Sequence, residues 1–77
     1  MKFYFDGELI RTSKTHHYTH AVVIPTKPGA TNKWDALGCR SSLESAQALL
    51  TQERRRIAKY TPEKAHALRV VALEVKA

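Results

Sequence analysis

The chain has 77 residues and a mass of 8.7 kDa, and its 13 Lys and Arg against seven Asp and Glu give a formal net charge of +6. A chain of this length forms one small domain, residues 1–77, whose thin core leaves no room for a substrate cleft between two lobes. Apolar residues make up 43% and charged residues 26% of the sequence, which is typical of a folded domain rather than a disordered one.

Membrane and secreted proteins are disfavoured by simple features of the sequence. No apolar run approaches the roughly 18 residues that cross a membrane, so we expect no membrane partner. Asp6 interrupts the short apolar run at the N-terminus, which is not the pattern of a signal peptide. The single cysteine, Cys39, has no partner for an internal disulfide, which is typical of a protein of the reducing cytoplasm.

The first predicted element is a β-hairpin. Asp6-Gly7 separates two β-forming runs, residues 3–5 and 8–12, and this dipeptide favours the type I′ turn that joins paired strands. The alternative is a single strand with a bulge at Gly7.

A second strand is predicted from Tyr18 to Thr26, where β-branched and aromatic residues are frequent. A long loop, residues 25–40, is expected to follow, because Pro25 ends the strand and Pro28-Gly29 is a turn signal. The only tryptophan, Trp34, lies in this loop. We favour a role in the core for Trp34, since a thin core needs every large apolar side chain. The alternative is an exposed anchor for a partner.

Residues 42–59 are predicted to form an amphipathic helix. Ser41 and Glu44 have the spacing of a capping box at its start. The apolar residues that recur at helical spacing are Leu43, Ala46, Leu50, Ile57 and Tyr60. Thr61-Pro62 has the pattern of a new helix start, so a short second helix is expected over residues 62–67 after a kink.

Residues 69–76 are predicted to form one half-buried strand, because apolar residues alternate along it. The order β-β-(β)-α-β then predicts an α+β fold, a two-layer domain in which one main helix covers one face of an antiparallel sheet of three to four strands. The residues expected to face the helix are Val22, Ile24, Val71 and Leu73. The opposite face, with Ala21, Val23 and Val70, is expected to remain uncovered and to bind a partner or form a homodimer.

Basic residues gather in and near the predicted helix. Five of them lie between residues 40 and 60 against two acids, a net charge of +3: Arg40, Arg54, Arg55, Arg56 and Lys59. One interpretation is a solvated helix end that suits the negative end of the helix dipole. The other is a binding surface for nucleic-acid phosphates or for an acidic protein. The common nucleic-acid-binding motifs are not found in the sequence.

His16, His17 and His20 form a cluster before the second strand. Three imidazoles can hold zinc, but no acid nearby in the sequence would orient them, so we predict no metal site and keep the three residues as minor candidates. Cys39 precedes Arg40 and a helix start, which can lower a thiol pKa, but a small buried apolar side chain is the favoured interpretation. No arrangement of residues is typical of catalysis, so we predict that the protein is not an enzyme and needs no cofactor.

Two parts of the sequence match a known pattern. Arg11-Thr12 is followed by Tyr-Thr-His-Ala-Val-Val at residues 18–23, and Ser42 and Ala46 have the spacing of a capped helix start. In these parts the chain resembles small single-domain proteins encoded by bacteriophages and mobile elements. The resemblance implies an accessory protein in the cytoplasm of a bacterial host. Proteins of this size class often block host defences, including CRISPR interference complexes, by binding them.

We therefore expect a non-enzymatic phage or mobile-element protein that binds and sterically inhibits a host protein or ribonucleoprotein complex, such as a CRISPR effector. The alternative is a basic nucleic-acid-binding module. The expected binding residues are Arg40, Arg54, Arg55, Arg56 and Lys59, with Trp34 and Tyr18 as aromatic anchors.

Overall fold

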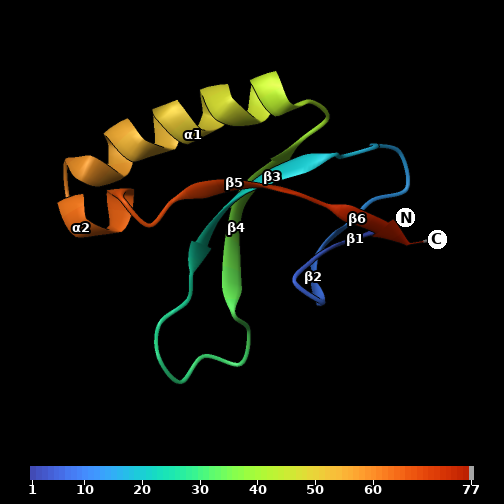
Figure 1. The fold of residues 1–77 in the computed structure, drawn as a ribbon, viewed down its shortest axis with the longest axis horizontal. Coiled ribbons are helices and arrows are strands. Elements are labelled where there is room, and N and C mark those ends of the chain that lie inside the picture. Colours follow the sequence, from blue (N-terminus) through green and yellow to red (C-terminus); the bar gives the residue numbers. More distant parts are fainter. Residues whose placement is uncertain (77) are drawn as a thin grey trace.

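The computed structural model describes residues 1–76, which form six strands and two helices (Figure 1). The strands are β1 (Lys2–Phe5), β2 (Glu8–Thr12), β3 (His20–Pro25), β4 (Trp34–Arg40), β5 (Arg69–Ala72) and β6 (Glu74–Lys76). The helices are α1 (Leu43–Ala58) and α2 (Pro62–Ala65). Neither of the helices described in this range is long and apolar enough to cross a membrane.

The strands form two antiparallel sheets of three strands each. The order is β2-β1-β6 in one, the N-terminal sheet, and β4-β3-β5 in the other, the central sheet. The α+β class is confirmed, with one main helix packed on the central sheet. The predicted strand 69–76 is divided at Leu73, whose N–H donates to the Thr19 carbonyl at 2.9 Å, so that β5 and β6 belong to different sheets.

The β1–β2 hairpin has the predicted turn. Asp6 and Gly7 have φ angles of 54° and 75°, and a type I′ turn requires positive φ at both central residues. Phe5 pairs with Glu8 across this two-residue loop. The alternative of a single strand with a bulge at Gly7 is therefore wrong.

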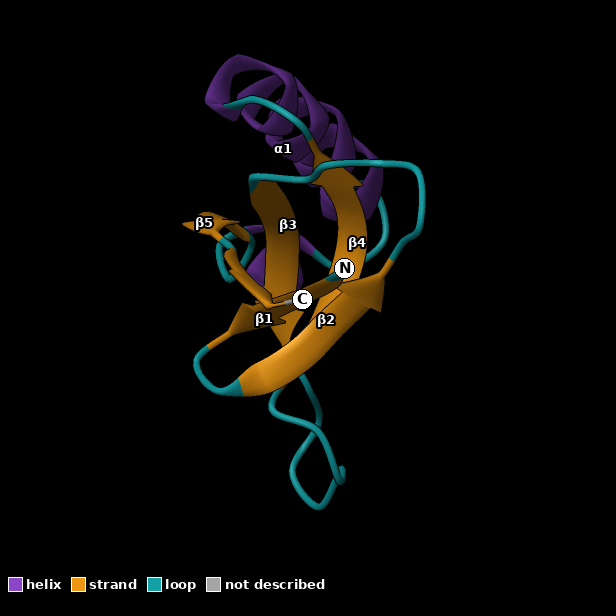
Figure 2. Ribbon diagram, turned by 90° about the vertical axis from the view of Figure 1, so that its right-hand side faces the viewer, coloured by secondary structure: helices purple, strands orange, loops and turns teal. Residues whose placement is uncertain are grey.

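The molecule has three layers, the N-terminal sheet, the central sheet and α1. Figure 2 shows the β1–β2 hairpin crossing in front of β3 and β4, with α1 beyond them. The core between the two sheets is built on Ala21, Val23, Cys39 and Val71. The core between the central sheet and α1 is built on Val22, Leu49 and Leu68. The sequence predicted the second of these cores, and the N-terminal sheet adds the first.

The sheet face that we expected to remain uncovered is buried. Ala21 and Val23 are 0% exposed, because the N-terminal sheet packs on this face. The expected faces of the last strand are also exchanged: Val71 and Leu73 lie on this buried face, whereas Val70 lies on the helix side. Val71 pairs with Ala21, and paired residues of neighbouring strands share a face. The chain itself therefore occupies the face on which a homodimer was expected.

The expected loop 25–40 is irregular only over residues 26–33, because Pro25 is the last residue of β3 and residues 34–40 form β4. β4 contains no Val, Ile or Thr and has Gly38 in its interior, so local preferences do not predict a strand there. All residues of β3 pair with residues of β4. This pairing, rather than local preference, makes residues 34–40 a strand.

Glu8 ties the start of β4 to the N-terminal sheet. Its carboxylate accepts hydrogen bonds from the backbone N–H groups of Lys33 and Trp34, at 2.7 and 3.3 Å. This contact joins residues far apart in the sequence, so the first hairpin and the β3–β4 hairpin hold each other in place.

The ends of the helices follow the predicted signals with one shift. Ser42, not Ser41, is the N-cap of α1, and its hydroxyl oxygen accepts a hydrogen bond from the Ser45 N–H at 3.1 Å. The expected cap at Ser41 is therefore wrong by one residue. Pro62 is the first residue of α2, as predicted, and α2 ends at Ala65.

Gly38 lies where α1 packs closely on the central sheet. A Cβ atom at this position would be 2.7 Å from Cδ2 of Leu49, whose side chain is buried in the core under α1. The glycine therefore allows the helix to approach β4.

We expect Gly38→Ala to lower the free energy of unfolding by about 1–3 kcal/mol, because the added methyl group overlaps the Leu49 side chain. Urea denaturation followed by circular dichroism measures this change. Combining it with Leu49→Ala removes the overlap, so the double variant should be less destabilised than the sum of the single variants. Additive losses would show that this contact is not the cause.

Candidate functional site

The structure separates the predicted binding residues into three places. Arg40 and Tyr18 lie near the N-terminal end of α1, because the Thr19 N–H donates to the Arg40 carbonyl at 2.9 Å and β4 leads directly into the helix. The arginines at 54–56 and Lys59 lie at the other end of α1, whose 16 residues span about 24 Å. Trp34 lies with the core between the sheets. The expected residues therefore do not form one continuous surface.

Near the N-terminal end of α1 the surface is hollowed. This hollow, called the Tyr18 hollow below, has a volume of about 310 Å³. Its lining residues are Arg11, His16, His17, Tyr18, Cys39, Arg40 and Ser41. Two guanidinium groups and two imidazoles line it and no carboxylate does, which makes it an electropositive site.

The aromatic ring of Tyr18 is the centre of a stack in this hollow. His16 stacks on it with the rings 5° from parallel and 5.5 Å apart. The guanidinium carbon of Arg11 lies 5.7 Å from the Tyr18 ring, and the Phe3 ring packs edge-on at 5.2 Å. Phe3 is fully buried, so the Tyr18 ring packs against a side chain of the protein interior.

The segment that presents His16 is held by backbone hydrogen bonds. The Ser13 hydroxyl accepts from the His16 N–H at 2.9 Å and from the Thr15 N–H at 3.3 Å. Ser13 is itself fixed to Met1, since the Ser13 N–H donates to the Met1 carbonyl at 3.0 Å and the Met1 ammonium donates to the Ser13 carbonyl at 2.8 Å. His16 is therefore exposed but placed on an ordered turn.

Both guanidinium groups lie close enough to act on the Cys39 thiol. Burial raises the pKa of Cys39 above its ordinary value of 9.0, and the positive charges of Arg11 and Arg40 oppose that rise without cancelling it. One Nη of Arg40 donates to the Cys39 carbonyl at 2.8 Å, which leaves the other donors of the guanidinium available. Cys39 is 3% exposed, which agrees with the expected buried apolar role.

The three histidines of the sequence cluster have different contacts, although His16 and His17 both line the Tyr18 hollow. Nδ1 of His16 lies 3.1 Å from the Thr15 hydroxyl, Nδ1 of His20 lies 2.8 Å from the Thr19 hydroxyl, and the His17 ring packs edge-on against Phe3. Within residues 1–76, no group of three or more His, Cys, Asp or Glu side chains is arranged to hold a metal ion.

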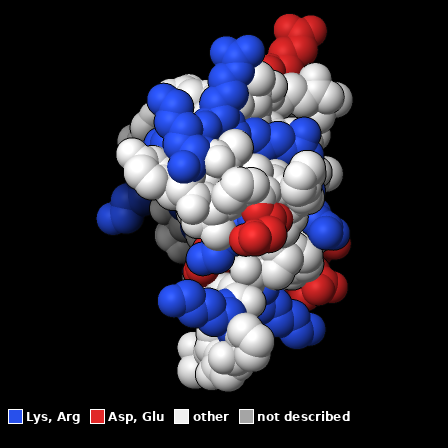
Figure 3. All heavy atoms as spheres, turned by 90° about the vertical axis from the view of Figure 1, so that its left-hand side faces the viewer, with Lys and Arg blue, Asp and Glu red and all other residues white. Residues whose placement is uncertain are grey.

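The C-terminal end of α1, with Arg54, Arg55, Arg56 and Lys59, is called the arginine end. Some of these side chains already bind groups of the protein itself. Arg54 donates to the Leu68 carbonyl at 3.2 Å, and Arg56 forms a salt bridge with Glu53. Arg54 and Arg55 both line a hollow of about 460 Å³ between α1 and α2, and Arg55 forms no salt bridge within the described residues. Figure 3 shows this side of the molecule, where Lys and Arg side chains project from the upper part.

Trp34 has the core role that the sequence favoured. It is half-buried and packs against the core between the sheets, with the Phe5 ring 5.3 Å away in an edge-on arrangement. The guanidinium carbon of Arg69 lies 5.3 Å from its ring. Its indole nitrogen is buried without a hydrogen-bond partner in the described residues. Trp34 is therefore a structural side chain rather than an exposed anchor.

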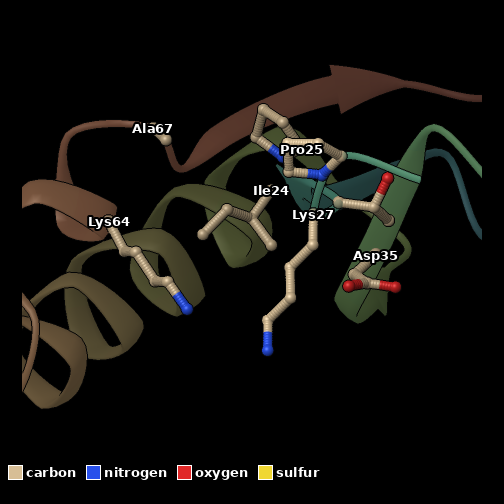
Figure 4. A pocket seen from close by; sticks show the side chains of 8 residues that line it. Ile24, Pro25, Lys27, Asp35, Lys64 and Ala67 are labelled. Atoms are coloured by element: carbon tan, nitrogen blue, oxygen red, sulfur yellow. The ribbon is translucent and has the colours of Figure 1, made fainter. Parts of the chain in front are cut away.

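A further hollow, of about 320 Å³, lies at the opposite end of β3 from Tyr18 (Figure 4). The side chains of Lys27 and Lys64 extend on either side of Ile24, and Asp35 adds a carboxylate. It contains no aromatic side chain in its lining, and its floor is apolar. It is therefore a weaker site for an anion than the Tyr18 hollow.

Sequence reasoning missed Arg11. Nothing in the pattern of β2 marks this residue, which occupies a strand position next to Ile10. It joins the site because β2 packs beside β4, which brings Arg11 and Arg40 to the same hollow. No family model, curated protein or solved structure matches the chain.

We expect stability to fall as the pH rises above about 9, partly because of Cys39. The folded protein keeps the thiol proton to a higher pH than the unfolded chain does, so this contribution is complete below the unfolded pKa and is lost as the pH rises through the raised folded pKa. Urea midpoints at about pH 7.5 and 10 measure the loss, and Cys39→Ala should show a smaller one. Equal losses in both proteins would contradict the role of Cys39.

Proposed function

We propose that this protein is a non-enzymatic binding protein whose partner is a nucleic acid, either free or within a ribonucleoprotein complex. The observation that supports this is the large excess of cations without an acidic partner. Of the 13 Lys and Arg, only Arg56 forms a salt bridge within residues 1–76. The others have no acidic partner there; Arg11, Arg69 and Lys76 lie over aromatic rings, and the rest interact with water, with the protein backbone or with an external anion.

A regular polyanion matches this surface better than a single small anion does. The Tyr18 hollow and the arginine end lie at opposite ends of α1, so a partner that contacts both must carry negative charges over a distance of about 24 Å. A phosphate backbone carries such charges, and their neutralisation releases bound counterions, which favours association.

The resemblance to phage and mobile-element proteins supports a narrower form of this proposal. In that form the protein acts in the cytoplasm of a bacterial host and blocks a host ribonucleoprotein complex, such as a CRISPR effector, by binding an acidic or RNA-lined groove of that complex. The mechanism is steric and needs no cofactor. With overall extents of 38 × 31 × 16 Å, the folded chain is large enough to obstruct such a groove.

We expect the protein to bind labelled nucleic acid with a steep dependence on salt. If four phosphates are neutralised, the affinity should fall about a hundredfold between roughly 50 and 200 mM salt. Fluorescence anisotropy with single-stranded RNA and duplex DNA measures both affinities. The absence of binding at the lower salt concentration would contradict the proposal.

Charge reversal tests which cations contact the phosphates. Arg55→Glu with Lys59→Glu should weaken binding and reduce the slope of log affinity against log salt by about two, one for each lost contact. The matched control is Lys2→Glu with Lys76→Glu, which reverses the same number of charges on the exposed N-terminal sheet. An equal effect of the two double variants would show that net charge rather than the arginine end determines binding.

We also expect the protein to inhibit target binding by a guide-RNA-loaded CRISPR effector when both are mixed in vitro. Arg55→Glu should lose this inhibition while remaining folded, because Arg55 is exposed and forms no salt bridge within the described chain. Competition electrophoresis with labelled target DNA measures the effect. Full inhibition by the variant would exclude the arginine end as the contact.

A further inference from the structure

The Tyr18 hollow has a more specific chemistry than positive charge alone. We propose that it holds one unstacked nucleotide of a single-stranded nucleic acid, with the base stacked on His16 and the adjacent phosphate between Arg11 and Arg40. This inference rests on the proposed nucleic-acid function. It adds that the bound nucleic acid is single-stranded and that it contacts the protein at the Tyr18 hollow.

The size of the hollow fits a single nucleotide. Its volume of about 310 Å³ lies at the lower end of the range of roughly 300–1,000 Å³ that is usual for small-molecule sites. A base within a duplex is stacked on both faces and cannot enter such a site. Bases of single strands are free to leave the stack and to pack on aromatic side chains.

The base-binding surface is His16 rather than Tyr18. The Tyr18 ring already has His16 stacked on it, with Arg11 and Phe3 also packed against it. His16 is exposed and has one face on Tyr18, so a base would extend an existing stack. The hydrogen bonds that the Thr15 and His16 N–H groups donate to the Ser13 hydroxyl hold this segment before any ligand binds, which lowers the entropy cost of binding.

The phosphate-binding groups are the two arginines. Arg11 and Arg40 both line the hollow. The positive charge of each also opposes the rise in the pKa of the Cys39 thiol, so both charges lie near one region of the hollow. Guanidinium groups bind phosphate oxygens through paired N–H donors. No acidic side chain lines the hollow to repel the phosphate, and the Ser41 hydroxyl offers a further donor.

Substitutions of His16 separate base stacking from charge. His16→Leu replaces the stacking ring by an aliphatic side chain that still covers Tyr18, and it keeps both arginines, so a single-stranded hexanucleotide should bind about tenfold more weakly, within the range for one lost base–aromatic stack. His16→Phe keeps a stacking ring and should restore the affinity. His20→Ala is the matched control, since His20 is an imidazole of the same sequence cluster that does not line the hollow, and it should leave binding unchanged.

The experiment measures the fluorescence anisotropy of a labelled single-stranded RNA hexanucleotide and of a labelled duplex. The salt concentration is about 200 mM, because salt weakens the contribution of the phosphate contacts to the affinity. The expected result is that His16→Leu weakens binding of the single strand and leaves binding of the duplex unchanged. If all His16 variants bind the single strand as the native protein does, the nucleotide site is overturned while the proposed nucleic-acid function stands. If neither nucleic acid binds even at about 50 mM salt, the function and the site fail together.

Discussion

Strand β3 is buried on both of its faces, and the other elements pack against one face or the other. Ala21, Val22 and Val23 are all 0% exposed, so consecutive residues of this strand point into two different cores. A strand in a sheet covered on one face leaves alternate residues in water. Here α1 covers one face and the N-terminal sheet covers the other. A chain of 77 residues thus builds two small cores on one strand instead of a single larger one.

The covering hairpin has a consequence for the surface as well as for the core. When β2 packs beside β4, Ile10 joins the core between the sheets, and Arg11 is placed at the Tyr18 hollow. The same packing buries Phe3, which supports the Tyr18 ring from beneath. The core and the proposed nucleotide site are therefore built by one contact between layers. This explains how a protein with so little interior can bring an aromatic ring and two arginines together at its surface.

The distribution of charge also follows from the thin core. No charged side chain is buried in the described residues, so the basic excess stays on the surface. The rigid α1 keeps the Tyr18 hollow and the arginine end apart, and two of the three consecutive arginines bind their own chain. A run of basic residues in a sequence is therefore a poor guide to the number of cations that a partner meets. Arg55 has no such partner within the described residues, whereas Arg54 donates to the Leu68 carbonyl and Arg56 forms a salt bridge with Glu53.

The sequence by itself determined the elements whose signals are local. The turn at Asp6-Gly7, the helix that follows Ser42 and the helix start at Pro62 depend on the backbone preferences of a few neighbouring residues. Only the tertiary structure decided that β4 is a strand, that the chain changes sheets at Leu73, and that the N-terminal sheet closes the second face of β3. Each of these depends on pairing and burial between residues far apart in the sequence. The Tyr18 hollow has the same origin, because Arg11 meets Arg40 only after the layers have packed.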